Sequence, residues 1–280
     1  MGDFISIDNN PDLQDIKPNL QGVPETLLIP LWARAVEAEQ ARPIIKDAKA
    51  AEIMNGIDYD FAKFSKAWKS QIGIVVRTEL LDHATRNFIQ KYPNAVVINI
   101  GCGLDTRFAQ VDNGNIHWYD LDLPEVIQIR QNFFVETDRY RMIAKSVFDD
   151  ALLGKIRETG KPVLIIAEGI LMYFTVQEVK TLLNKLISEF PMAEMLLEVM
   201  SPDIVKMSKQ HDAVGTMNVK FQWGIKNSQE LETYNKQIRV VNEWNYFDYH
   251  KDRGSWLGWL AVIPTFKNRF NNRIVRLQFT

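Results

Sequence analysis

The chain has 280 residues, a formal net charge of −2 and a hydrophobic fraction of 46%, which is the composition of a folded globular protein. This apolar content excludes a largely disordered chain, and a single cysteine excludes a disulfide scaffold. The four histidines have no metal-ligand spacing, and the charge gives no general attraction to nucleic acid. No apolar run reaches the ~20 residues of a membrane span, and the opening residues lack a signal-peptide pattern, so we expect a cytoplasmic protein.

The N-terminal quarter of the chain predicts an arm followed by helices. Residues 1–23 are polar and contain prolines and a glycine, as expected of a loose arm. Residues 24–69 carry apolar side chains at helical spacing, and a second stripe over residues 76–88 predicts a longer helix. We expect residues 1–69 to form an arm and a helical lid, and residues 70–280 to form the main domain.

Short apolar runs that are typical of buried strands then alternate with helical segments. One helix is expected from Pro124 to Phe134, and another after the capping-box pair Thr175 and Glu178. Such alternation predicts parallel βαβ units and a doubly wound α/β sheet. Residues 202–236 look helical and mixed, and residues 245–272 look loop-like and aromatic. The expected strands are residues 95–100, 116–121, 141–144, 163–167, 195–200, 239–244 and 273–279.

The densest chemical signal is the loop NIGCGLDTR at residues 99–107, directly after the first expected strand. Gly101 and Gly103 would let a ligand approach the backbone, although a tight strand-to-helix turn uses glycines in the same way. Asp120 and Asp122 end the next strand, about 20 residues later, where an acid can hold both hydroxyls of a ribose. The two features together predict a nucleoside-containing cofactor.

The charges in this loop favour one cofactor over another. A dinucleotide fingerprint requires a third glycine where this chain has Thr106, and no glycine-lysine phosphate loop is present. Asp105 beside the glycines would repel a pyrophosphate, but it suits the sulfonium and amino groups of S-adenosylmethionine. We therefore expect S-adenosylmethionine rather than NAD.

Three segments, VVINIGCGLDTRF, WYDLDLPEVI and AEGILMYF, resemble the leucine carboxyl methyltransferase family, which includes bacterial polyketide-synthesis O-methyltransferases. The resemblance is strong over residues 70–200 and weaker in the flanks. It implies the class I methyltransferase fold, a seven-stranded and mostly parallel sheet with one reversed strand. It also implies S-adenosylmethionine as the cofactor.

The resemblance assigns cofactor contacts to particular residues. Arg77 matches an arginine that reaches the methionine carboxylate, and Asp122 matches the ribose acid, with Asp120 as the second candidate. Asp105 either bonds within the loop or faces the amino group. Ser146 stands where the commoner pattern beside adenine has an acid. The full expected set is Arg77, Gly101, Gly103, Asp105, Asp122, Ser146, Val147 and Glu168.

The sequence leaves the catalytic residues and the methyl acceptor open. A carboxylate acceptor needs no general base at pH 7, whereas a phenol or alcohol does. The catalytic candidates are Glu168, Tyr173 and Arg107, the last as an anion anchor. We expect residues 202–272 to form the acceptor pocket. Its candidate lining residues are Trp223, Trp244, Tyr246, Tyr249 and Trp256, although aromatic residues in such positions more often belong to a core than to a pocket.

Three functions agree with these observations. The first is methyl transfer to a carboxylate or hydroxyl of a small molecule, and the second is methyl transfer to a protein C-terminal carboxylate. The third is a nucleoside-binding or NAD-binding α/β protein without methyl transfer. The sequence predicts no metal, nucleic-acid or membrane partner and leaves the oligomeric state open.

Overall fold

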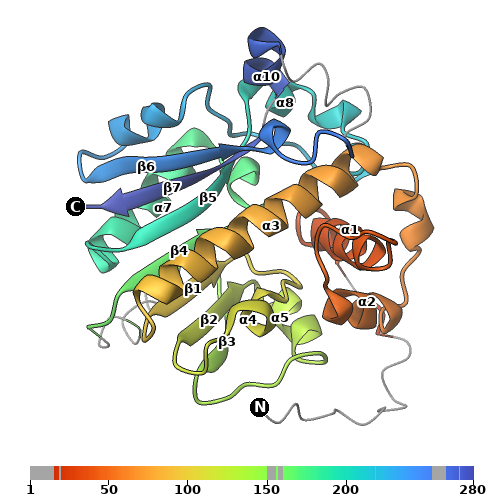
Figure 1. The fold of residues 1–280 in the computed structure, drawn as a ribbon, viewed down its shortest axis with the longest axis horizontal. Helices are drawn as coiled ribbons and strands as arrows, with labels where there is room; N and C mark the ends of the chain where they lie inside the picture. Colours follow the sequence, from red (N-terminus) through yellow and green to blue (C-terminus); the bar gives the residue numbers. More distant parts are fainter. Residues whose placement is uncertain are drawn as a thin grey trace.

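The computed structural model describes residues 16–18, 20–149, 156, 160–217, 219–253, 263–270 and 272–280. Seven strands form one sheet in the order β3-β2-β1-β4-β5-β7-β6 (Figure 1). Strands β1 to β5 are parallel to one another, and β7 is antiparallel to both β5 and β6. The strands are β1 Val96–Ile100, β2 His117–Asp122, β3 Tyr140–Ala144, β4 Val163–Ala167, β5 Glu194–Val199, β6 Ile238–Asn245 and β7 Arg273–Phe279.

This architecture confirms the expected class I methyltransferase fold, including its reversed strand and all seven predicted strands. The central strands are apolar on both faces because helices cover both faces of the sheet. In β1, Val96, Ile98 and Ile100 belong to one core cluster, and Val97 belongs to the cluster on the opposite face.

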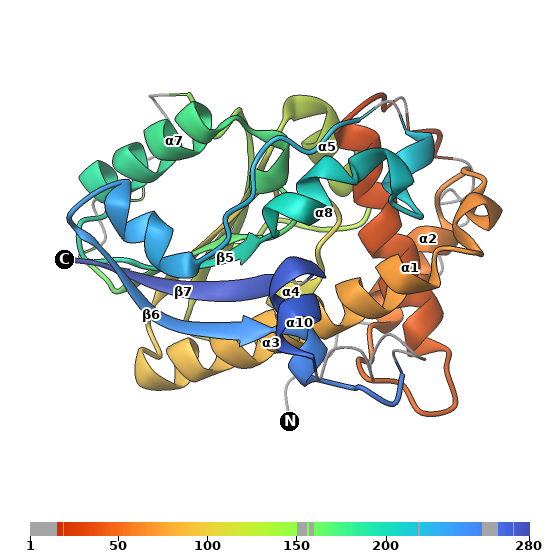
Figure 2. The same ribbon diagram turned by 90° about the horizontal axis from the view of Figure 1, so that it is seen from above.

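Helices on opposite faces hold the sheet between them (Figure 2). The long helix α3, Trp68–Lys91, packs with α4, Arg107–Val111, on one face. Helix α7, Val176–Glu189, packs on the other face and starts with the predicted capping box of Thr175 and Glu178. The helices of the described residues include none that is long and apolar enough to cross a membrane.

The N-terminal helices form a separate layer. Helices α1, Leu28–Ala38, and α2, Ala48–Asn55, pack together around a second cluster of buried residues beside the start of α3 (Figure 1). Short 3₁₀ turns, Pro24–Leu27 and Phe61–Phe64, flank them. Most of the predicted arm lies outside the described residues, although Ile16 forms a bridge with Ile57.

Three local expectations need correction. Helix α5, Pro124–Arg130, ends before Phe133 and Phe134, because the chain breaks into turns there. Residues 202–236 contain α8, Pro202–Lys206, followed by isolated 3₁₀ turns and extended chain rather than long helices. The stretch expected to be loop-like includes helix α10, Pro264–Phe270.

Candidate functional site

A cavity of about 640 Å³ lies at the carboxyl ends of the parallel strands β1, β2, β4 and β5. Ligands of open α/β sheets bind at this edge, and the volume is in the range of small-molecule sites. The N-terminal helical segment contributes Leu27 and Pro30 to its wall, α3 contributes Arg77, and the C-terminal part contributes Phe221 and Tyr246. One cavity therefore joins the predicted cofactor loop to the predicted acceptor region.

The glycine loop has the backbone geometry that the sequence predicts. Gly101 has φ +66° and Gly103 has φ +49°, both in the left-handed region that favours glycine. A Cβ at Gly101 would overlap with Cδ1 of Ile170, and one at Gly103 would lie 3.2 Å from Cβ of Leu27. The N–H groups of Gly101 and Cys102 both donate to the carbonyl of Leu121, which ties the loop to β2.

We expect Gly101→Ala to destabilise the protein more than Gly114→Ala. Gly114 has φ +81°, and a Cβ added there would have nothing within 4 Å, so alanine costs only the left-handed backbone, about 1–2 kcal/mol. At Gly101 the overlap with Ile170 adds about 1–3 kcal/mol. Urea unfolding of both variants measures the difference, and equal losses would contradict the close packing around the loop.

The two acids at the end of β2 have different surroundings. Asp122 lines the cavity and accepts hydrogen bonds from the backbone N–H groups of Gly103 at 2.7 Å and Leu123 at 2.8 Å. Burial raises its pKa against these bonds. Asp120 is 0% exposed, does not line the cavity and accepts from Trp118, Tyr140 and other buried donors. Of the two acids, Asp122 is the one that lines the cavity.

Two polar residues that the sequence did not single out hold this loop. Arg130 donates to the carbonyl of Gly103 at 3.0 Å and to the carboxylate of Asp120. The Nδ2 group of Asn99 donates to Asp105 and to Asp120, at 3.0 Å in both cases. The first link depends on a residue nearly thirty positions away, so only the folded chain reveals it.

Arg77 lies in the cavity wall between two acids. Its Nε donates to Oε1 of Glu168 at 2.7 Å, and its Nη1 donates to Oε2 of Glu198 at 2.8 Å. A guanidinium has five N–H groups, so these two bonds leave donors for a ligand carboxylate. Glu198 on β5 also accepts from the hydroxyl of Tyr246 at 2.9 Å and was not predicted from the sequence.

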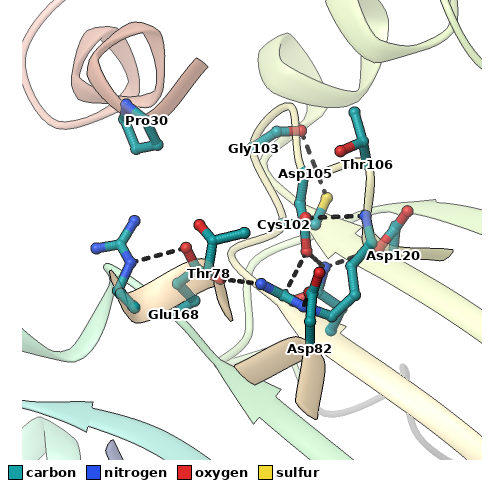
Figure 3. A network of polar contacts seen from close by, with 12 residues as sticks. Pro30, Thr78, Asp82, Cys102, Gly103, Asp105, Thr106, Asp120 and Glu168 are labelled. Atoms are coloured by element: carbon teal, nitrogen blue, oxygen red, sulfur yellow. Dashed lines mark hydrogen bonds and ion pairs between the residues drawn. The ribbon is translucent and has the colours of Figure 1, made fainter. Parts of the chain in front are cut away.

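Arg107 is not an anion anchor, contrary to the prediction. It is 2% exposed, and its guanidinium donates to Asp82, Asp105 and Glu168. Figure 3 shows these three carboxylates close together. Each of the three carboxylates accepts one bond of 2.7 Å from Arg107, which does not line the large cavity. Its charge is therefore used to neutralise buried acids. The side chain of Asp105 bonds within the loop, the first of the two predicted alternatives.

Glu168 joins the two arginines. Burial opposes its negative charge, but Arg77 and Arg107 outweigh this effect and lower its pKa to about 2. Both carboxylate oxygens are engaged, Oε1 by Arg77 and Oε2 by Arg107. An acid with this pKa and these partners is a poor general base at neutral pH.

The remaining predicted residues are divided between the cavity and the core. Ser146, Val147 and Tyr173 line the cavity, and burial raises the pKa of Tyr173 to about 12. Tyr246 and Tyr249 also line it, as predicted. Trp223 does not, because it is fully buried in the core under α7. Trp244 packs against the core on the α3 face, and Trp256 lies outside the described residues.

Helices α1 and α2 are fastened to the glycine loop by a buried polar cluster. Arg34 of α1 donates to the carbonyl of Leu104 and to the hydroxyl of Thr106, at 2.8 Å in both cases. Asp47 at the start of α2 accepts from both Arg34 at 2.7 Å and Thr106 at 2.6 Å. Thr106, which replaces the third glycine of a dinucleotide fingerprint, thus anchors α1 and the start of α2 to the loop. This role is invisible in the sequence because Arg34 lies about seventy residues earlier.

The cavity wall fits S-adenosylmethionine. A side chain at Gly101 or Gly103 would fill space beside the loop, Asp122 faces the cavity with lone pairs left for ribose hydroxyls, and Arg77 retains donors for a carboxylate. Glu168 and Glu198 add negative charge beside Arg77. This mixture of charges suits a ligand that carries both a carboxylate and cationic groups.

Comparison with known proteins agrees with this geometry. The family model "Leucine carboxyl methyltransferase" matches residues 28–187. The tetracenomycin polyketide synthesis O-methyltransferase TcmP of Streptomyces glaucescens is 32% identical over 267 residues, which cover 93% of this chain and 98% of that protein. The S-adenosyl-L-methionine-dependent methyltransferase dpfgK of Gibberella zeae is 27% identical, and the match covers 88% of this chain and 89% of that protein.

Solved structures support the fold. A DUF574 family protein from Streptomyces avermitilis matches with a TM-score of 0.56 at 10% identity, covering 90% of this chain and 97% of its own. A SAM-dependent methyltransferase from Anabaena variabilis matches with a TM-score of 0.53 at 12% identity, and the match covers 80% of this chain and 96% of that protein. The family match over more than half of the chain, joined to this fold, decides the assignment: the protein belongs to the leucine carboxyl methyltransferase family and is an S-adenosylmethionine-dependent methyltransferase.

Proposed function

We propose that the protein transfers a methyl group from S-adenosylmethionine to an oxygen atom, a carboxylate or hydroxyl, of a small aromatic molecule. The observation that carries this proposal is the continuity of the cavity. Its wall runs from the glycine loop to a group of apolar and aromatic side chains of α3 and the C-terminal part. These residues are Trp68, Met207, Phe221, Phe247, Tyr249, Phe266 and Phe270.

Within this proposal the cofactor is held by residues from four strand ends and α3. Asp122 would hold the ribose hydroxyls, and Ser146 and Val147 would lie beside the adenine. Arg77 would hold the methionine carboxylate with its remaining N–H groups, while Glu168 fixes the guanidinium in position. Asp120 would have only a structural role, because its oxygens are already bonded to four buried donors.

The chemistry in this proposal depends on positioning rather than on a strong base. When bound, the cofactor supplies an electrophilic methyl group on a sulfonium. Glu168 is held ionised between two arginines, and Tyr173 keeps its proton because its pKa is about 12. The apolar and aromatic wall would limit the water around the reacting atoms, and the bond of Arg34 to the Leu104 carbonyl holds α1 against the glycine loop. An acceptor oxygen that is already ionised suits this site best.

The ribose assignment predicts the effect of Asp122→Asn. Loss of the charge-assisted bonds is expected to weaken S-adenosylhomocysteine binding by about 1.5–3 kcal/mol, measured by titration calorimetry. Glu125→Gln is the matched control, because it removes the same charge from an exposed position in the first turn of α5. Unchanged affinity in a folded Asp122→Asn variant would refute the ribose role.

The acceptor is tested by incubating the protein with labelled S-adenosylmethionine and separate sets of aromatic acids, phenols and peptides. We expect a product that is heavier by one methyl group in the aromatic sets, detected by mass spectrometry. A product formed only from peptides ending in a free carboxylate would favour the protein C-terminal reaction. Binding of NAD without binding of S-adenosylhomocysteine would overturn methyl transfer altogether.

The proposal also covers the organisation of the chain. Residues 24–69 would act as the lid over the cofactor, and the described part of residues 202–272 would build the acceptor half of the cavity. A cytoplasmic location and the lack of nucleic-acid and membrane partners remain predictions made from the sequence.

A further inference from the structure

Two histidines line the acceptor half of the cavity, His211 and His250. Nε2 of His250 lies 2.6 Å from Oε2 of Glu79 on α3, so its ring is used to fasten its own segment. Nε2 of His211 has no partner among the described residues. His211 is therefore the histidine of this pair that is available to a ligand.

The backbone around His211 determines which ring nitrogen carries the proton. Nδ1 of His211 accepts from the backbone N–H groups of Ala213 at 3.4 Å and Val214 at 3.3 Å. Because Nδ1 is an acceptor, the neutral ring carries its proton on Nε2. Burial lowers the pKa of His211, against the opposing charge of Asp212, which favours the neutral ring.

Asp212 positions the segment that carries His211 without forming a hydrogen bond to its ring. Its carboxylate accepts from the Ser70 hydroxyl and from the backbone N–H groups of Lys69 at 3.1 Å and Ser70 at 3.4 Å, at the start of α3. The Oδ1 atom lies 3.8 Å from Nδ1 of His211, beyond hydrogen-bond distance. This carboxylate thus fastens the segment to α3 and leaves the Nδ1 acceptor role unchanged.

A row of rings connects His211 to the cofactor side of the site. The centroid of the Phe221 ring lies 5.5 Å from that of the His211 ring, in an edge-to-face arrangement, and 5.6 Å from that of the Tyr173 ring. Tyr173 follows the Glu168–Gly169 turn after β4. His211 therefore lies in the aromatic half of the cavity. The contacts from His211 to Phe221 and from Phe221 to Tyr173 connect it to the chain that follows β4 and Glu168.

We propose that His211 binds the acceptor directly, with its Nε2–H donating a hydrogen bond to the ionised oxygen group that receives the methyl. This inference rests on the proposed function and deepens it. A neutral donor orients an oxyanion while reducing its negative charge less than a cation would. In this tautomer Nε2 has no lone pair in the ring plane to take a proton, so His211 does not act as the base for a protonated hydroxyl.

The test compares two replacements of His211 with a matched control. Phe keeps a flat ring against Phe221 but has no donor, whereas Gln keeps an amide N–H donor. Loss of a hydrogen bond to an anion is expected to reduce kcat/KM for the acceptor roughly 10- to 100-fold in His211→Phe. We expect His211→Gln to retain most of the activity, and both variants to bind S-adenosylhomocysteine as the wild type does. His83→Gln, on the exposed surface of α3, is the control.

Two outcomes would overturn the role of His211. The first is an equal loss of kcat/KM in the Phe and Gln variants, which is the result expected of a general base. The second comes from the ¹⁵N chemical shifts of the His211 ring, if they place the proton on Nδ1 at neutral pH. Failure of the wild-type protein to methylate any acceptor would instead count against the proposed function, so the two failures are distinguishable.

Discussion

Replacing Arg107 with methionine is expected to lower the free energy of unfolding by about 3–5 kcal/mol. The guanidinium is the shared partner of Asp82, Asp105 and Glu168, and its removal leaves Asp105 without its principal charge partner. Burial raises the pKa values of Asp82 and Asp105, because both carboxylates lose hydrating water when the protein folds. Without Arg107, this loss of hydration is no longer compensated by its positive charge. Urea unfolding at neutral pH measures the loss.

Arg86→Met is the matched control for this substitution. Arg86 is on the same helix as Asp82 and lies 3.8 Å from it, but its side chain is 41% exposed. Removing an exposed pair of this kind is expected to cost at most about 1 kcal/mol. A similar small loss for Arg107→Met would show that the three acids do not depend on Arg107. Recovery of stability in Arg107→Met/Asp82→Asn would support the interpretation, because one uncompensated charge is then removed.

The second large effect is a pH-dependent contribution of Glu168 to stability. Its pKa is lowered in the folded protein to about 2, against 4.5 as the ordinary value. The stabilisation is therefore fully present above about pH 4.5 and is lost as the pH falls toward 2, because protonation then favours the unfolded chain. A pKa shift of this size corresponds to a contribution of about 3 kcal/mol to the free energy of unfolding.

The comparison of the wild type with Glu168→Gln isolates this contribution. Other acids with shifted pKa values, such as Asp82 and Asp122, are present in both proteins and largely cancel in the difference. The difference in free energy of unfolding should be constant from pH 7 to about pH 5 and should shrink below that. Urea unfolding at steps of pH measures it. A difference that stays constant down to pH 3 would contradict the pairing of Glu168 with the two arginines.

The sequence by itself determined the sheet and the position of the cofactor loop. Strand and helix periods are local properties, so all seven strands and the capping box of α7 could be predicted. The two loop glycines and the acids after β2 were also recognisable, because a fixed spacing along the chain places them at one edge of a parallel sheet.

The tertiary structure decided which charged residues face the cavity and which neutralise one another. Both Arg77 and Arg107 were candidates for binding a ligand anion, but Arg77 lines the cavity and Arg107 is enclosed by three acids. Glu198 and Arg34 of α1 gain their roles from partners that lie far away in the sequence. Local patterns set backbone conformation, whereas the state of a buried charge depends on whichever distant groups the fold packs against it, and this information exists only in the folded chain.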